Sequence, residues 1–110
     1  MQKISLTALA RQQLELAQIA SSGRSSSTVY GGHEHQLRQT MIALTVGQML
    51  SEHENPGEAT VHVLHGRVRL GAGETSWDGA SGDLLIVPDR RHTLEALEDA
   101  TVLLTVAKHP

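Results

Sequence analysis

The sequence predicts an all-β domain, an antiparallel sandwich or barrel, preceded by a single α-helix. The first observation behind this class is the N-terminal segment, residues 4–19, where apolar side chains recur at steps of three and four. The second is the remainder of the chain, where glycines and prolines separate short segments that lack the helical period. The length, 110 residues, allows one such domain and leaves no room for a second.

The N-terminal helix is expected to begin at Ser5 or Thr7, because either side chain can accept a hydrogen bond from the first helical turn. It should end before Gly23, since glycine takes the left-handed conformation that follows many helices. One helix cannot bury its apolar stripe alone, so it is expected to pack on the sheet or on a partner subunit. The stripe consists of Ile4, Leu6, Leu9, Leu14, Ala17 and Ile19.

The serine run at residues 25–27 favours a loop after the helix. We therefore divide the chain into a helical arm with a serine-rich linker, residues 1–27, and a barrel domain, residues 28–110. Residues 102–106 are apolar on both faces of a strand, which predicts cover by the second sheet, the helix or another subunit. The expected strands are Leu37 to Val46, Gln48 to Glu54, Ala59 to Leu64, Arg67 to Leu70, Thr75 to Trp77, Asp83 to Val87, Thr93 to Leu97 and Thr101 to Ala107.

Composition excludes several classes of function. A net charge of −3 supplies no electrostatic footprint for nucleic acid, so we expect no nucleic-acid partner. No apolar run approaches the roughly 20 residues that cross a bilayer, and the N-terminus lacks the apolar core of a secretion signal. The chain has no cysteine, which removes disulfides and thiolate metal sites. We therefore expect a cytoplasmic protein without a membrane partner.

Two motifs carry a resemblance to a known family. In the first motif, Gly47 is followed after five residues by His53, after one more residue by Asn55-Pro56-Gly57-Glu58, and later by Gly66. In the second motif, Gly82 is followed after five residues by Pro88 and then by His92. In this order, with fifteen residues between Gly66 and Gly82, they resemble the two motifs of the cupin superfamily, over residues 37–107. The resemblance implies a small jelly-roll double-sheet barrel, usually a homodimer, with a ligand cavity in its mouth.

In metal-binding cupins the first motif supplies two histidines and a glutamate, and the second supplies another histidine. Carried over by position, His53 matches the first ligand and His92 the last, while Asn55 stands where the second histidine is expected and Ala59 where the glutamate is expected. Glu58 is adjacent, but an offset of one residue on a strand turns it to the opposite face. The resemblance thus implies a ligand pocket lined by His53, Asn55 and His92, with His53 and His92 as the metal candidates.

The altered ligand set weakens the expectation of a metal, because catalytic metal sites normally keep three protein ligands. No cofactor is expected, and a divalent metal stays open as the alternative. The favoured explanation of His53 and His92 is a hydrogen-bonded polar pair inside a cavity. His33-Glu34-His35 has a period of two, so on an extended strand both histidines would share a face and could complete the site; a solvated loop is the simpler interpretation.

Other polar residues have plainer explanations. Arg67 and Arg69 alternate with apolar residues, which indicates a strand with one face in water. Arg90 stands where the second cupin motif has a glycine, and with Arg91 it precedes His92, so this loop could attract a carboxylate or a phosphate. Trp77 could cover a pocket or plug the end of a strand.

Three functions remain open. The favoured one is a non-enzymatic cupin-like protein that binds a small polar ligand, with no catalytic residue assigned. The second is a metal-dependent enzyme of the oxygenase or isomerase type found among cupins. The third is a structural or regulatory dimerisation module whose barrel is packed solid. The partners expected are a second copy of the chain and a small molecule.

Overall fold

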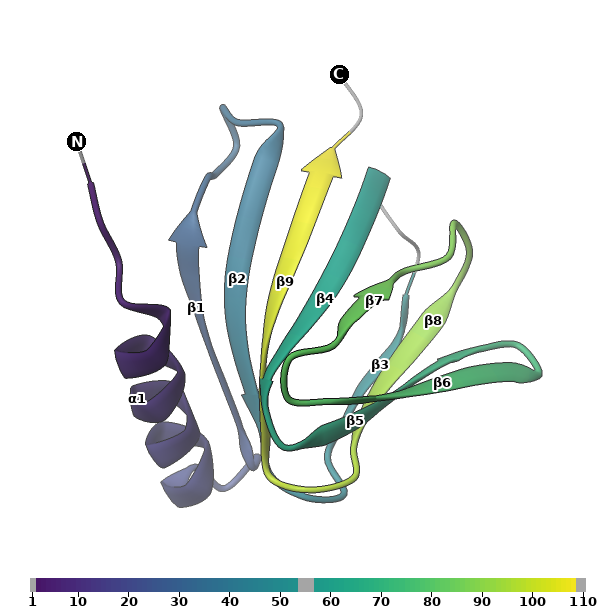
Figure 1. Cartoon of the computed structure of the whole chain (residues 1–110), viewed down its shortest axis with the longest axis horizontal. Helices are drawn as coiled ribbons and strands as arrows, with labels where there is room; N and C mark the ends of the chain where they lie inside the picture. The colour runs from purple at the N-terminus through teal and green to yellow at the C-terminus, as the bar shows by residue number, and fades with distance from the viewer. Residues whose placement is uncertain (1, 54–56, 109–110) are drawn as a thin grey trace.

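A computed structural model describes residues 2–53 and 57–108, whose strands form two antiparallel sheets with one helix outside them (Figure 1). The helix is α1 (Leu6–Ile19). The first sheet has the order β1 (Arg24–Tyr30), β2 (Leu37–Leu44), β9 (Ala100–Lys108), β4 (Gly57–His65) and β7 (Leu84–Ile86). The second sheet has the order β3 (Met49–His53), β8 (His92–Ala96), β5 (Arg67–Ala72) and β6 (Thr75–Ala80). This jelly-roll arrangement confirms the predicted fold class.

The helix begins and ends as its sequence predicts. The Ser5 side chain caps it by accepting a hydrogen bond from the amide of Ala8, at 3.2 Å. The last turn closes where the amide of Ala20 donates to the carbonyl of Leu16, and the chain reverses before Gly23. Ala17 is fully buried against the first sheet, whereas Ile19, part of the predicted stripe, is exposed. No helix in the described part of the chain has the length and apolar character needed to cross a membrane.

The serine run forms part of strand β1, so the loop expected there is wrong. Ser25 pairs with Ala43 of β2, and the first sheet begins at Arg24. Ser25 is directed toward α1, where its hydroxyl donates to the side-chain oxygen of the buried Gln13. The strand forms because the neighbouring strand β2 supplies its backbone partners and Ser25 fits beneath the helix.

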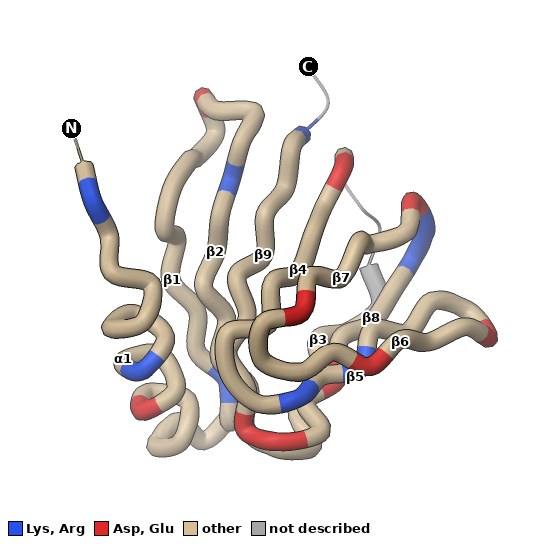
Figure 2. Tube along the Cα trace, in the orientation of Figure 1, with Lys and Arg blue, Asp and Glu red and all other residues tan. Residues whose placement is uncertain are grey.

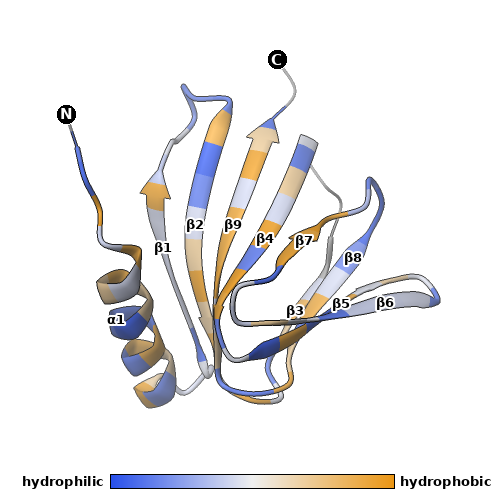
Figure 3. Ribbon diagram, viewed as in Figure 1, coloured by the Kyte–Doolittle hydropathy of each residue, from blue (hydrophilic) through white to orange (hydrophobic). Residues whose placement is uncertain are grey.

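The central strand β9 has core residues on both of its faces, as its apolar sequence predicts. Val102 and Val106 of β9 belong to the core between the sheets, while Leu103 packs under α1 with Met41 and Ala10. Figure 2 shows no charged residue in the middle of β9 and β4, and in Figure 3 apolar bands alternate there with more hydrophilic ones. The inner core consists of Ile42, Leu44, Ala59, Val61, Val63, Val68, Leu70, Val87, Leu94, Ala96, Ala100, Val102 and Val106.

Candidate functional site at the open end of the barrel

His92 lies at the end of the barrel where β3 ends, β8 begins and the β7–β8 loop crosses, which we call the open end (Figure 1). Along β8 the buried residues alternate, and Leu94 and Ala96 belong to the inner core. His92 shares their face because side chains two positions apart point to the same side of a strand. Its exposed fraction is 6%, so this histidine is an inner-face residue, as the resemblance implies.

The backbone register pairs His53 with His92. Leu50 of β3 lies opposite Leu94 of β8, and His53 lies opposite His92. The chain takes three steps from Leu50 to His53 along β3 but only two steps from Leu94 to His92 along β8. A regular ladder would have set residue 52 opposite His92; the extra residue is a bulge-like irregularity that brings residue 53 there instead. The backbone register therefore sets residue 53, and not residue 52, across from His92.

A backbone carbonyl fixes the proton on the His92 ring. The His92 Nδ1 atom is 3.0 Å from the carbonyl oxygen of Arg90, and a carbonyl oxygen only accepts, so Nδ1 carries the hydrogen in this contact. The neutral ring therefore has its lone pair on Nε2. The guanidinium of Arg90 in turn donates to the carbonyl of Ala72, at 2.7 Å. This contact connects the β7–β8 loop to the β5–β6 turn.

The role of Arg90 was not evident in the sequence. Its place in the sequence predicts an attractor for a free anion, but its guanidinium donates to the backbone carbonyl of Ala72. A backbone acceptor carries no residue-specific signature, so no pattern of side chains indicates Ala72 as the partner.

Strand β4 presents an alanine to the barrel interior at the position where the family carries a glutamate. Ala59 is buried in the inner core, and Glu58 is exposed on the opposite face. Asn55 lies outside the described residues. Within residues 2–53 and 57–108, no group of three or more histidine, cysteine, aspartate or glutamate residues is placed to hold a metal ion.

The remaining histidines lie elsewhere. His33 and His35 are exposed in the β1–β2 loop, not on an extended strand, although Figure 1 places that loop at the same end of the barrel as the β7–β8 loop. The rings of His35 and Tyr30 meet edge to face, with centroids 5.2 Å apart. His62 is half-buried on the outer face of β4.

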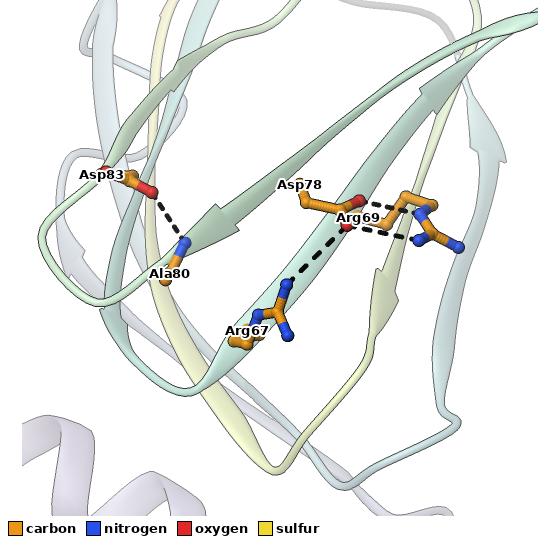
Figure 4. A network of polar contacts seen from close by, with 5 residues as sticks. All are labelled: Arg67, Arg69, Asp78, Ala80 and Asp83. Carbon is orange, nitrogen blue, oxygen red and sulfur yellow. Dashed lines mark hydrogen bonds and ion pairs between the residues drawn. The ribbon is translucent and has the colours of Figure 1, made fainter.

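The outer face of the second sheet carries a small charged network (Figure 4). Asp78 of β6 accepts from Arg69 at 2.8 and 3.3 Å and lies 4.0 Å from Arg67. The hydrogen bond from Arg69 lowers the pKa of Asp78 and, in return, raises the pKa of Arg69. Both arginines are therefore occupied on a solvated face, as the alternating pattern predicts.

Trp77 lies at the edge of the second sheet. It lies opposite Leu70 on the edge strand β6, and 45% of its surface is exposed. Because Leu70 belongs to the inner core, Trp77 occupies an inner-face position on the part of the hairpin that extends beyond the barrel.

Comparison with solved structures identifies the fold. A scan against protein-family models and a search of curated proteins find no match. A conserved protein of unknown function from Streptococcus pyogenes superimposes with a TM-score of 0.74 at 27% identity, covering 83% of this chain and 79% of that one.

Two further structures are described as cupins. An RmlC-like cupin from Desulfovibrio desulfuricans gives a TM-score of 0.67 at 25% identity, with 76% of this chain and 81% of that one covered. A cupin superfamily protein from Desulfitobacterium hafniense gives 0.72 at 17% identity, with 78% of each chain covered. With the jelly-roll topology described above, these likenesses identify the chain as a small domain with the fold of the cupin superfamily.

Proposed function

We propose that this chain binds a small polar ligand at the open end of the barrel, in a pocket lined by His53, Asn55 and His92. The observation that carries the proposal is the pairing of His53 with His92 across β3 and β8. His92 is buried on the inner face although it is polar, and ionisable residues are seldom buried without a hydrogen-bonding role. The aliphatic core fills the interior beyond Leu94, so the ligand would sit at the end of the barrel and not at its centre.

The loop before β8 orients the ring of His92. Its Nδ1–H group donates to the Arg90 carbonyl, which sets the tautomer and the orientation of the imidazole. The contact between Arg90 and Ala72 holds the loop that carries this carbonyl. A site whose groups are already oriented loses less conformational entropy on binding, which favours affinity for a small ligand.

The residues present do not fit a catalytic divalent metal ion. Such sites normally combine three protein ligands with an open position. His53 and His92 provide two imidazoles, the inner-face position of β4 holds Ala59, and the carboxylate of Glu58 is on the other face. We therefore favour a binding protein over a metal-dependent enzyme. Elemental analysis of protein purified without a histidine tag tests this choice, since a stoichiometric transition metal would favour the enzyme.

The experiment for the ligand is a thermal-shift screen. Polyols, monosaccharides and hydroxy acids are tested one at a time, and each compound that raises Tm is retested on His53→Ala, His92→Ala and the outer-face control His62→Ala. The proposal expects the shift to vanish in the first two variants and to persist in the third. A shift that persists in both barrel-end variants would remove the pocket from this end of the barrel.

Self-association has a separate observation in its favour. Leu84 and Ile86 of the edge strand β7 are 56% and 69% exposed, and Ile86 borders a groove of about 520 Å³ on the outer face of β4, β7 and β9. Exposed apolar side chains beside a groove favour burial against another protein surface. We propose a homodimer, and light scattering coupled to gel filtration tests it: a monomer at micromolar concentration contradicts it.

A further inference from the structure

We infer that a second ligand site lies outside the barrel, between α1 and the first sheet, and that it takes a small amphiphile with one carboxylate group. The site is a groove of about 350 Å³ at the end of the barrel opposite the open end. It is separate from the pocket proposed above, because β4 and β9 lie between the groove and the barrel interior. We call it the helix groove.

The walls of the helix groove are apolar. Leu6, Ala10 and Leu14 line it from the helix, and Leu64 lines it from β4. Leu6, Ala10 and Leu64 also belong to the cluster that holds α1 on the sheet, so this wall is part of the packed structure and not of a mobile surface. Such a wall suits an aliphatic chain or ring.

The floor contains a polar group without a partner. Thr101 lines the groove, is 1% exposed, and its Oγ1 atom has no hydrogen-bond partner among the described residues. Thr101 and Leu103 are two positions apart on β9, so both face α1. A buried hydroxyl without a partner costs free energy, and a ligand oxygen that accepts its hydrogen would recover that cost.

The rim supplies a positive charge. Arg11 lines the groove, and its guanidinium forms no ion pair within the described residues, whose ion pairs all involve Asp78. Glu15, one helical turn further on, does not pair with it. His65 also lines the groove, close enough to the carboxylate of Asp99 to interact with it electrostatically. Arg11 is therefore the rim cation available to an incoming anion.

An apolar wall, a hydroxyl donor and an unpaired guanidinium together match one chemical class. A carboxylate has two acceptor oxygens, which can take hydrogen bonds from the Thr101 hydroxyl and the Arg11 guanidinium, while an alkyl tail lies against Leu6 and Leu14. An amphiphile with a cationic head would meet like charge at Arg11. The occupant we propose is therefore a medium-chain monocarboxylate.

The test titrates sodium octanoate into the isotopically labelled full chain and follows backbone amide shifts by NMR. Saturable shifts are expected at residues of α1, at Leu64 and His65, and at Thr101, with a millimolar Kd typical of a ligand of about ten non-hydrogen atoms. Octylammonium has the same chain length and the opposite charge, and it should produce no saturable shift at these residues.

Three variants complete the test. Thr101→Val removes the hydroxyl at nearly constant shape, and Arg11→Gln removes the exposed charge without touching the core; each should weaken octanoate binding roughly fivefold. Arg38→Gln, an exposed arginine at the open end, should leave the affinity unchanged. Equal binding of octylammonium, unaltered affinity in Arg11→Gln, or octanoate shifts confined to other residues would each overturn the proposal.

Discussion

His53 of β3 and His92 of β8 lie directly opposite each other, although 38 intervening residues separate them in the sequence. Their pairing depends on the extra residue that β3 accommodates between Leu50 and His53. Without it, residue 52 would lie opposite His92 in the backbone register. The bulge-like irregularity thus decides which residue of β3 pairs with His92.

The contact between Arg90 and Ala72 is expected to hold the His92 ring in place. In Arg90→Ala the carbonyl that accepts from Nδ1 remains, but the 2.7 Å hydrogen bond that ties its loop to the β5–β6 turn is lost. The free energy of unfolding should fall by about 1 kcal/mol. Nitrogen NMR of the His92 ring should show a mixture of tautomers where the parent protein shows Nδ1 protonated. Arg24→Ala, an exposed arginine on β1, is the control, and an unchanged ring spectrum in Arg90→Ala would contradict the positioning role.

Local patterns were sufficient to predict most of the fold. The strand segments between glycines, the helix cap at Ser5 and the double cover of residues 102–106 all follow from period and turn chemistry, which act over a few residues. Strand β1, which contains the serine run, was not predicted because its stability comes from pairing with β2 and packing under α1. Such tertiary contacts override the local preference of serine for loops.

The candidate site was predictable only in part. The second motif indicates His92, and alternation along β4 correctly separates Ala59 from Glu58. The irregularity in β3 and the hydrogen bond from Arg90 to a backbone carbonyl were not predictable, because neither has a recognisable sequence pattern. The helix groove depends likewise on how α1 lies across the sheet.

Asp99 should make stability depend on pH in the acid range. Its carboxylate accepts hydrogen bonds from the amide of Val46 at 2.8 Å and from Gln18 at 3.1 Å, and these bonds lower its pKa in the folded chain. A carboxyl group whose pKa is lower in the folded state stabilises the fold above its unfolded-state pKa, and this contribution is lost as the pH falls through the folded-state pKa.

The corresponding variant is Asp99→Asn. It should be less stable than the parent by about 1 kcal/mol near neutral pH, with the difference shrinking below about pH 4. Urea denaturation at a series of pH values measures it, with the exposed neighbour variant Glu98→Gln as the control. A stability difference that stays constant from neutral to acid pH would show that ionisation of Asp99 contributes nothing.

Thr101→Val should stabilise the ligand-free protein. The Thr101 side chain is buried with its hydroxyl unpartnered, so replacing that hydroxyl by a methyl group removes a desolvation cost without removing a hydrogen bond. The free energy of unfolding should rise by about 1 kcal/mol. Thr101→Ser keeps the hydroxyl and removes the methyl group, so it should lower stability by about 1 kcal/mol. If urea denaturation shows both variants destabilised, the hydroxyl has a partner in solution.

Gly66 of the first motif should tolerate alanine less well than Gly82 of the second motif. Gly66 and Gly82 have φ angles of +81° and +93°, a region that side chains other than glycine rarely adopt. A Cβ atom at Gly66 would also lie 2.2 Å from the carbonyl oxygen of Asp99, whereas one at Gly82 would meet nothing within 4 Å.

Alanine at the two positions separates backbone strain from steric clash. Gly82→Ala carries strain alone and should cost about 1 kcal/mol of unfolding free energy. Gly66→Ala adds a clash with backbone that cannot rotate away, so its cost should exceed that of Gly82→Ala by a further 1–3 kcal/mol, roughly that of an overpacked core. Thermal and urea denaturation of the two variants measure the difference. Equal destabilisation would mean that the turn between β8 and β9 yields to the added methyl group, and that its close approach to Gly66 contributes little to holding the two sheets together.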